Sequence, residues 1–258
     1  MSVGLVYITG ASSGIGQALA LRYYRAGWCL ALVARRAVAL QAWAEAQQFS
    51  ADRYAVYGAD VSDIAAITAV GRACMAAQGL PDVVIANAGI SIGVDTAVYE
   101  DLAVLQRVYA TNNIGLAATF QPFIAPMNAR RSGTLVGVAS VGGIRGMPGH
   151  GAYNASKAAV ISYLESLRGE CRPFGVKVVT VVPGYVATPL TSQNRYDMPF
   201  LMQPKVFAEQ AFQAIQAGSS YRVIPWQMGV VAKVLRLLPN WLFDRLLAGR
   251  PRKHRGTE

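Results

Sequence analysis

The chain alternates short runs of β-branched and other apolar residues with longer segments in which apolar side chains recur every three or four positions. Short apolar runs are typical of buried parallel strands, and the longer periodicity is typical of the helices that connect them. Strands are predicted over residues 3–9, 28–34, 53–58, 82–87, 134–140, 177–182 and 221–224. Helices are predicted over residues 14–25, 38–48, 64–78, 100–123, 152–172 and 205–217. The pattern predicts a single α/β domain, a doubly wound Rossmann-type parallel sheet of about seven strands with helices on both faces.

Residues 185–204, after the sixth predicted strand, do not follow this alternation. They are loop-like, with three prolines and scattered apolar side chains. Ligands bind beyond the carboxyl ends of the strands in open α/β sheets, and loops of this length in compact domains are often functional. We therefore predict a lid over a substrate, with an ordinary surface loop as the alternative.

Residues 226–258 form an amphipathic, basic extension beyond the main domain, which is predicted over residues 1–225. Aliphatic side chains between Val230 and Leu238 fall on one face of a helix, with Lys233 and Arg236 on the other. Apolar residues resume at 241–247, before a basic end at 250–255. Such a segment can lie on a membrane surface, pack on the core, cover a partner subunit or close a pocket, and the pattern leaves these alternatives open.

The net charge is +10, and the extension carries half of it, with seven Lys or Arg residues against two acidic ones. A basic tail attracts anionic membranes or nucleic acid, but we predict no nucleic-acid partner because the chain has no recognised binding motif. Three separated cysteines and two histidines without ligand spacing predict neither a disulfide framework nor a metal site. No uninterrupted apolar run approaches the ~18 residues of a spanning helix. We predict a cytoplasmic protein, at most peripheral to a membrane surface.

A glycine-rich turn follows the first predicted strand and leads directly into a helix. It reads Thr9-Gly10-Ala11-Ser12-Ser13-Gly14-Ile15-Gly16. Glycines permit a tight turn and close approach of the backbone, and a helix N-terminus offers free N–H groups to a pyrophosphate. The spacing is TGxxxGxG and not the common GxGxxG. Taken alone, it leaves a purely structural turn as an alternative.

Tyr153 and Lys157 lie at positions i and i+4 of a predicted helix, on the same face and one turn apart. A phenol titrates near ~10, and a neighbouring ammonium favours the phenolate, so we expect Lys157 to lower the pKa of Tyr153. Ser140 is predicted to end the fifth strand, where ligands gather, with a turn residue as the alternative. Asn112 lies in a predicted helix, where asparagine has low propensity, so we predict a role beyond that of a helix-surface residue.

These motifs resemble those of the short-chain dehydrogenase/reductase family, whose cofactor loop has the TGxxxGxG spacing. Tyr153 and Lys157 match its YxxxK pair, Ser140 precedes the tyrosine by the family's 13 positions, and the NxxG pattern selects Asn112 over Asn113. The resemblance covers roughly residues 3–225, with all the main motifs in order. It departs at residues 138–142, which lack the paired serines of many relatives.

Three further segments match cofactor-contacting parts of the family. Asp60-Val61 matches the pair that contacts the adenine. Asn87-Ala88-Gly89 matches the motif that stabilises the sheet beside the cofactor. The segment that contacts the nicotinamide carboxamide is matched by Pro183-Gly184, Val186 and Thr188. The resemblance therefore implies a nicotinamide cofactor. The implied contacts are Gly10, Ser12, Ser13, Gly14, Ile15, Gly16, Arg35, Asp60, Val61, Asn87, Ala88, Gly89, Tyr153, Lys157, Pro183, Gly184, Val186 and Thr188.

The end of the second predicted strand indicates which nicotinamide cofactor is bound. An acidic residue there would accept hydrogen bonds from the ribose 2′-OH and repel a 2′-phosphate. This chain has Ala34 at that position, followed by Arg35 and Arg36. Arginine forks suit phosphate, and in the family a basic residue at the position of Arg35 indicates NADP. We predict NADP(H), with Arg36 either assisting Arg35 or solvated.

The resemblance also implies the roles of the four polar residues. Tyr153 donates a proton to a carbonyl as hydride arrives from the nicotinamide, and Lys157 binds the nicotinamide ribose. Ser140 orients and polarises the substrate, and Asn112 holds a water that relays protons to Lys157. The implied activity is the interconversion of a carbonyl and an alcohol. An NADP(H)-binding sensor with little catalysis is the alternative, and the intact set of four residues argues against it.

The substrate and the assembly are less closely defined. Residues 91–94 and 144–150, together with the lid, are the expected pocket contributors. Their apolar members favour a hydrophobic small-molecule substrate, and these are Ile92, Val94, Met147, Leu190 and Phe200. Family resemblance further implies a homo-oligomer.

Overall fold

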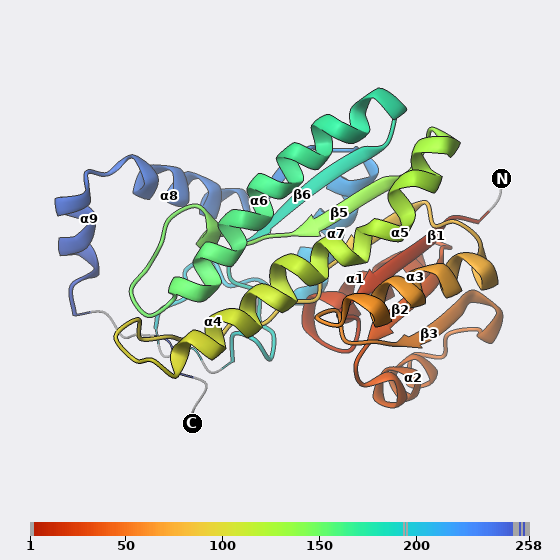
Figure 1. Ribbon diagram of the computed structural model, residues 1–258, viewed down its shortest axis with the longest axis horizontal. Coiled ribbons are helices and arrows are strands. Elements are labelled where there is room, and N and C mark those ends of the chain that lie inside the picture. Colours follow the sequence, from red (N-terminus) through yellow and green to blue (C-terminus); the bar gives the residue numbers. More distant parts are fainter. Residues whose placement is uncertain (1–2, 193, 195, 250–252, 254, 256–258) are drawn as a thin grey trace.

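The computed structural model describes residues 3–192, 194, 196–249, 253 and 255 (Figure 1). Within this range, seven parallel strands form one sheet in the order β3-β2-β1-β4-β5-β6-β7. They are β1 (Leu5–Thr9), β2 (Cys29–Ala34), β3 (Tyr54–Gly58), β4 (Val83–Ala86), β5 (Thr134–Val138), β6 (Lys177–Pro183) and β7 (Tyr221–Ile224). The order reverses between β1 and β4, where a doubly wound sheet opens its ligand crevice. The predicted Rossmann-type fold is confirmed.

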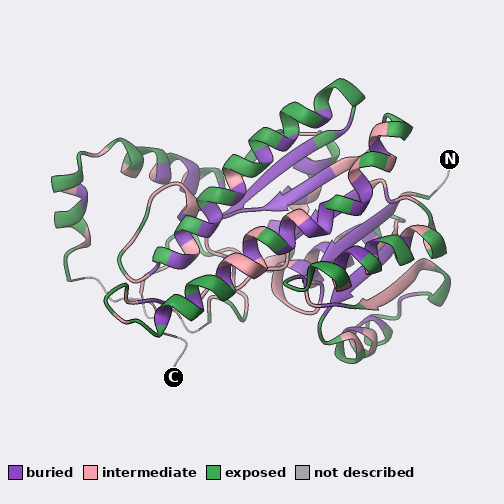
Figure 2. Ribbon diagram, viewed as in Figure 1, coloured by how far each residue is buried: buried purple, intermediate pink, exposed green. Residues whose placement is uncertain are grey.

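Alternate residues of each buried strand face two separate helical layers. In β1, Leu5 and Tyr7 belong to one apolar cluster, and Val6 and Ile8 belong to the other. The first cluster lies under α3 (Ile64–Gln78), α5 (Gly115–Arg130) and α6 (Gly151–Cys171). The second lies under α1 (Gly14–Arg25), α2 (Ala37–Ala46) and α7 (Pro204–Gln216). Figure 2 shows the central strands almost wholly buried between these layers. The sheet therefore offers ligands its strand ends and not its faces.

The helix predicted over residues 100–123 is present, but a π-helical turn interrupts it and it continues to Arg130. The chain forms α4 (Asp101–Tyr109), a π-helical turn (Ala110–Ile114) and then α5. A π turn adds one residue to the helical repeat, and such turns are frequent at functional sites. Gly115 begins α5 against the turn after β3, where a Cβ would lie 2.8 Å from the carbonyl oxygen of Val61. This close contact sets the start of α5, and hydrophobic periodicity does not report it.

Two strands end earlier than predicted. β4 stops at Ala86 and β5 stops at Val138, so Asn87 and Ser140 both lie beyond their strands. The Asn87 N–H donates to the side chain of Thr9, and the Ser140 hydroxyl accepts from the Gly142 N–H. Side-chain hydrogen bonds thus replace the sheet ladder at both places. Both polar residues stand at the mouth of the crevice.

The C-terminal segment folds as α8 (Trp226–Leu237) and α9 (Asn240–Leu247), beyond the end of β7 (Figure 1). Of the alternatives left open for its aliphatic face, packing on the core does not hold for Val230 and Val234. Met228, Gly229 and Ala232 are buried, whereas Val230 and Val234 are 53% and 54% exposed. A Cβ placed on Gly229 would lie 3.2 Å from Cβ of Val223 in β7. Because α8 lies this close to the sheet, the small residues Gly229 and Ala232 face it. Most of the predicted basic end lies outside the described residues.

Arg145, in the connection between β5 and α6, holds the two C-terminal helices. Its guanidinium donates to the carbonyl oxygen of Leu235, to that of Leu238 at 2.8 Å and to Oδ1 of Asn240 at 3.1 Å. It also lies 3.8 Å above the ring of Phe243. These bonds satisfy carbonyls that a helix C-terminus leaves without partners. The extension is thereby joined to the loop that follows Ser140.

Candidate active site

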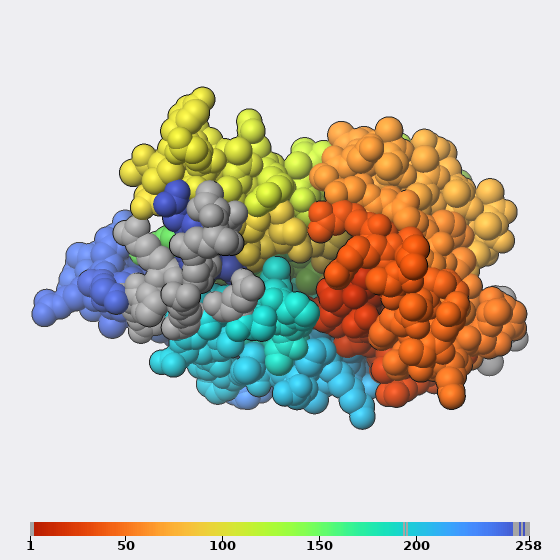
Figure 3. All heavy atoms as spheres, turned by 90° about the horizontal axis from the view of Figure 1, so that it is seen from below, coloured from red at the N-terminus to blue at the C-terminus, as the bar shows by residue number. Residues whose placement is uncertain are grey.

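A cavity of about 440 Å³ lies at the carboxyl ends of the central strands. This volume lies in the range of small-molecule and cofactor sites. Every predicted cofactor contact except Gly16 lines the cavity, as do Arg36 and Ser140. Figure 3 views the molecule from below, where N-terminal segments (red to orange) and the segment after β6 (cyan) lie side by side. Residues from most of the chain length therefore meet around one space.

The glycine loop is shaped by contacts that leave no room for side chains. Gly10 has a φ of +66°, and a Cβ there would lie 2.8 Å from Cα of Ala88. At Gly16 a Cβ would lie 2.1 Å from the carbonyl oxygen of Gly10. Gly16 thus does not contact the cavity but lets α1 begin directly beneath the loop. The helix N-terminus is left free to face a phosphate group.

Thr9 and Asn87 tie the glycine loop to the end of β4. The Thr9 hydroxyl accepts from the N–H groups of Asn87 and Ala88 at 3.2 and 3.3 Å. The Asn87 side chain donates to the carbonyl oxygens of Thr9 and Gly10 at 3.1 and 3.3 Å. Sequence reasoning missed Thr9 as a contributor, although it opens the TGxxxGxG motif. The network holds two walls of the cavity at a constant separation.

Cationic side chains stand at the far end of the cavity, beyond β2. Arg35 is largely exposed, and its Nη1 lies 3.5 Å from Oδ2 of Asp60. Asp60 Oδ1 accepts from the N–H and hydroxyl of Ser62 at 2.9 and 2.7 Å. Arg36 lines the same wall. Asp60 therefore holds Arg35 beside the cavity while leaving most of the guanidinium accessible to a ligand.

Lys157 is buried at the opposite end of the cavity, beside Tyr153. Its Nζ donates to the carbonyl oxygen of Val138 at 2.8 Å and lies 5.9 Å from the centre of the Tyr153 ring. Burial lowers the pKa of Lys157 to about 8, because desolvation disfavours the charged ammonium. The helical i and i+4 placement brings the two side chains to the same region of the cavity, as predicted.

The expected lowering of the Tyr153 pKa is not what the structure shows. Burial raises the pKa of Tyr153, hydrogen bonding to Ser140 opposes this rise, and nearby Tyr185 adds to it. Desolvation of the phenolate is the largest cause of the rise, and the Lys157 ammonium donates to a backbone carbonyl. The phenol of Tyr153 is therefore protonated at neutral pH.

Asn112 is buried, so the alternative of a helix-surface asparagine is wrong. Its Oδ1 accepts from the Ile90 N–H at 2.8 Å, and its Nδ2 donates to the Ile90 carbonyl at 3.0 Å and to the Ser156 hydroxyl at 2.9 Å. A Cβ on Gly89 would lie 3.2 Å from this Oδ1 and 3.4 Å from Nζ of Lys157. The π-helical turn thus places Asn112 next to Lys157, although Asn112 does not line the cavity.

Ser140 caps a short 3-10 turn, Val141–Gly143, and lines the cavity as well. A Cβ at Gly142 would lie 2.8 Å from Oδ1 of Asn154, and one at Gly143 would lie 2.6 Å from the backbone of Lys157. The glycines after Ser140 therefore let this turn approach α6. Both interpretations of Ser140, as a turn residue and as a site residue, fit its position.

A second, smaller cavity of about 70 Å³ adjoins Ser140 and Tyr153. As expected for a substrate pocket, Ser91, Met147, His150 and Leu190 line it. Tyr185, Asn194 and Tyr196 of the predicted lid also line it, as expected, whereas Lys253 is an unexpected contributor. Lys253 comes from the C-terminal tail, where no motif identified it.

Three of the expected apolar contributors do not line either cavity. Val94 packs in a separate apolar cluster to which Ile92 also contributes, and Phe200 is 50% exposed. The loop over residues 185–204 nevertheless borders both cavities, through residues that lie between Tyr185 and Tyr196. Its two ends are joined where the N–H of Ala187 donates to the carbonyl of Met202.

The chain is similar in sequence and in fold to several known proteins. Residues 4–199 match the family model described as short chain dehydrogenase. An uncharacterized oxidoreductase of Myxococcus xanthus is 38% identical over 95% of this chain and 96% of its own. A short-chain dehydrogenase from Sphingobium yanoikuyae, solved with NADPH, has a TM-score of 0.76 at 24% identity, over 92% of this chain and 97% of its own. A short-chain dehydrogenase/reductase from Burkholderia phymatum, solved with NAD, has a TM-score of 0.81 at 23% identity, over 98% of this chain and 97% of its own. The two solved structures show the shared fold.

The burial of His150, which lines the smaller cavity, predicts that the folded state loses stability in acid. Burial, aided by the charge of Lys253, lowers the pKa of His150 to about 4, whereas an unfolded histidine titrates near ~6.5. Between these values the unfolded chain binds more protons than the folded chain. The contribution of neutral His150 to the unfolding free energy is therefore full above about pH 6.5, and it declines until it is lost as the pH falls through about 4. We expect His150→Gln to lose less unfolding free energy than the wild type from pH 7 to 4, by at most about 3 kcal/mol.

The measurement is urea denaturation at pH 7, 5 and 4 for both proteins. Other acid-sensitive groups, such as Asp101 and Glu209, are common to the two chains and cancel in the comparison. Equal losses of stability would show that His150 does not carry this sensitivity.

Proposed function

The chain belongs to the short-chain dehydrogenase family, and from this premise we propose that it is an NADP(H)-dependent reductase that interconverts a carbonyl compound and its alcohol. It is an oxidoreductase with a Rossmann-type nucleotide-binding fold. The observation that carries the proposal is that Ser140, Tyr153 and Lys157 line the same cavity as the glycine loop. A nucleotide bound by the loop thus extends toward a proton donor.

The choice of NADP over NAD rests on the end of β2. Ala34 provides no carboxylate to bind a ribose 2′-OH, and Arg35 and Arg36 line the cavity directly after it. Most of the Arg35 guanidinium is exposed beside Asp60, so it can donate two hydrogen bonds to a 2′-phosphate. Asp60 is engaged with Ser62 and leaves the arginine fork available.

Tyr153 acts as the general acid of carbonyl reduction. When bound, the nicotinamide supplies the hydride for the carbonyl carbon. The phenol of Tyr153 gives its proton to the carbonyl oxygen, and its raised pKa keeps that proton available at neutral pH. The hydroxyl of Ser140, beside Tyr153 in both cavities, orients and polarises the same oxygen.

Lys157 and Asn112 complete the proton path in this proposal. A lysine with a pKa of about 8 exchanges protons readily near neutral pH, and Lys157 binds the nicotinamide ribose while returning a proton to Tyr153. Asn112 lies across Gly89 from Lys157 and positions the water that links the lysine to solvent.

The substrate class proposed here has an apolar portion. Val141, Met147 and Leu190 line the smaller cavity and can cover such a portion next to the reacting carbonyl. A panel in which sugars are reduced rapidly and apolar ketones are not would contradict this part of the proposal.

Two features support a homo-oligomer in a reducing compartment. Exposed Leu102 and Leu105 on α4, with Ile114 in the π-helical turn, give an apolar surface of the kind that subunits cover. Cys74 and Cys171 are buried free thiols, as is common where disulfides do not form.

We propose contact with an anionic membrane surface as a second role, located at α8 and α9. Trp226, Val230 and Val234 recur at helical spacing and are exposed, and Leu237 and Trp241 continue the apolar surface at 84% and 70% exposure. Lys233, Arg236 and Arg245 on the same helices are exposed cations. Among the helices that the structure describes, none is long and apolar enough to cross a membrane.

Replacing Tyr153 by Phe removes the proton donor while keeping the ring. We expect turnover of any ketone substrate to fall by at least about 10²-fold, because general acid catalysis contributes on this order. The Kd for NADPH, measured by fluorescence titration, should change little. Retained turnover would exclude Tyr153 as the acid, and tight NADPH binding without turnover in the wild type would favour the sensor alternative.

Replacing Arg35 by Ala tests the cofactor preference. Loss of a charge-assisted bidentate contact should raise the Kd for NADPH by about 10- to 100-fold and leave that for NADH nearly unchanged. Arg168 on α6 is exposed, and Arg168→Ala is the matched control, which should change neither the Kd for NADPH nor that for NADH. An equal rise in the Kd for NADPH and for NADH would contradict a contact between Arg35 and the 2′-phosphate. The same titration of Arg36→Ala decides whether Arg36 also binds the phosphate.

Membrane contact is tested by co-sedimentation with liposomes that contain anionic lipid. We expect the wild type to sediment and the double variant Trp226→Ser, Trp241→Ser to remain in the supernatant, because exposed tryptophans drive interfacial binding. Leu102→Ser, on α4, is the control for general loss of apolar surface. Failure of the wild type to sediment would remove this role.

A further inference from the structure

Lys253 lies in the wall of the smaller cavity, next to the groups that would act on the carbonyl. That wall also contains Ser140, Tyr153 and His150. Lys253 is neither exposed nor fully buried, and it belongs to the C-terminal tail, far along the chain from all three. Tertiary structure therefore brings a cation to the substrate side of the site.

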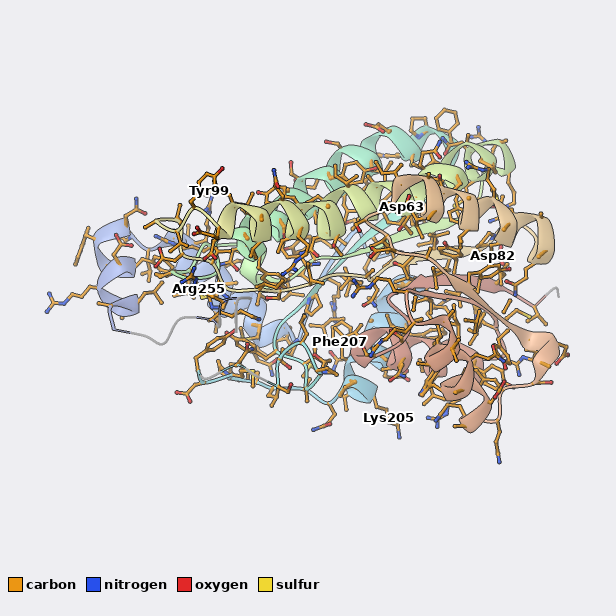
Figure 4. All side chains as sticks on the ribbon, turned by 60° about the horizontal axis from the view of Figure 1, so that its bottom comes forward. Asp63, Asp82, Tyr99, Lys205, Phe207 and Arg255 are labelled. Carbon is orange, nitrogen blue, oxygen red and sulfur yellow. The ribbon has the colours of Figure 1, made fainter. Side chains whose placement is uncertain are left out.

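An ion pair between the partly exposed Arg255 and a buried carboxylate holds the tail in this place. Arg255 donates to both carboxylate oxygens of Asp101 at 2.9 and 3.0 Å, and the Asp101 side chain is 2% exposed. Asp101 also accepts from the Asp95 N–H at 2.6 Å, and Arg255 forms a β-bridge with Gly93. Figure 4 shows Arg255 on the side that carries Tyr99, away from Lys205. Two residues of chain span at most about 7 Å, so this anchor keeps Lys253 beside the cavity.

Among the residues that the structure describes, none of opposite charge lines the cavity around Lys253. Its wall includes no Asp or Glu among the described residues. No described carboxylate forms an ion pair with Lys253; those of Asp95, Glu100 and Asp101 act on Arg255 instead. Burial lowers the pKa of Lys253 to about 8 and that of His150 to about 4, so near pH 7 the lysine is charged and the imidazole is neutral. A partly desolvated ammonium is destabilising unless an anion approaches it.

We propose that Lys253 is a specificity-determining residue that binds a carboxylate of the substrate, so that the protein reduces oxo acids to hydroxy acids. The carbonyl oxygen meets Tyr153 and Ser140, and the carboxylate meets Lys253 across the smaller cavity. Apolar Met147 and Leu190 cover the carbon chain between the two groups. This assignment rests on the proposed reductase function and adds the substrate's second functional group to it.

The experiment compares NADPH-dependent reduction of oxo acids of graded chain length with reduction of their neutral primary amides. We expect the wild type to prefer an acid over its amide at least tenfold in kcat/KM. Lys253→Met should reduce this preference about tenfold or more, chiefly through the KM for the acid, whereas Lys253→Arg should retain most of it. Lys205→Met, an exposed lysine on α7, is the matched control and should keep the wild-type preference.

The anchor is tested by the double variant Asp101→Asn, Arg255→Met, which removes both members of the ion pair and leaves no buried charge alone. It should lose the acid preference to the same extent as Lys253→Met, and adding Lys253→Met should lower it little further. A melting temperature for each variant confirms that it is folded. Full retention of the preference in the double variant would remove the positioning role of Arg255.

Two results would overturn the role of Lys253: a wild type that does not prefer acids, or a Lys253→Met variant that keeps the preference. A separate readout is calorimetric binding of a saturated carboxylic acid to the complex with NADP, which should be lost in Lys253→Met. Because this titration requires no turnover, it still decides the role of Lys253 if no carbonyl compound is reduced. Absence of turnover alone would count against the reductase and not against the carboxylate site.

Discussion

The site depends on the contact between two backbone segments at the point where the strand order reverses. Gly10 and Ala88 approach so closely that no Cβ fits between them, and Thr9 and Asn87 bond across the same boundary. The contact fixes the start of α1 relative to the end of β4. Both walls of the larger cavity extend from these two segments, so the nucleotide-binding space follows from this one constraint.

Burial controls the chemistry at the other end of the cavity. The helical repeat places Tyr153 and Lys157 on one face, yet desolvation and not mutual attraction dominates both pKa values. The pKa of the tyrosine rises and that of the lysine falls to about 8, so the two values move apart and the phenol becomes the weaker acid of the two groups. A protonated phenol beside an easily deprotonated lysine suits proton delivery to a carbonyl oxygen.

The C-terminal extension is joined to the site by two arginines. Arg145 binds the end of α8 from the loop after Ser140, and Arg255 binds Asp101 at the start of α4. Each contact connects the extension to an element that borders the smaller cavity or precedes the π-helical turn. The smaller cavity is therefore built partly by a segment that the family model does not cover.

The sequence by itself determined the strands, the glycine motif and the i, i+4 placement of Tyr153 and Lys157, because each is a pattern of residues a few positions apart. It did not determine where α4 ends, because the π-helical turn forms as Asn112 bonds to Ile90 and Ser156. It also could not give the direction of the Tyr153 pKa shift, since burial arises from the whole fold. Only the tertiary structure decided that the small residues of α8 face the sheet and that Lys253 reaches the cavity. Those contacts join residues far apart in the chain, and periodicity and motif spacing carry no information about such distances.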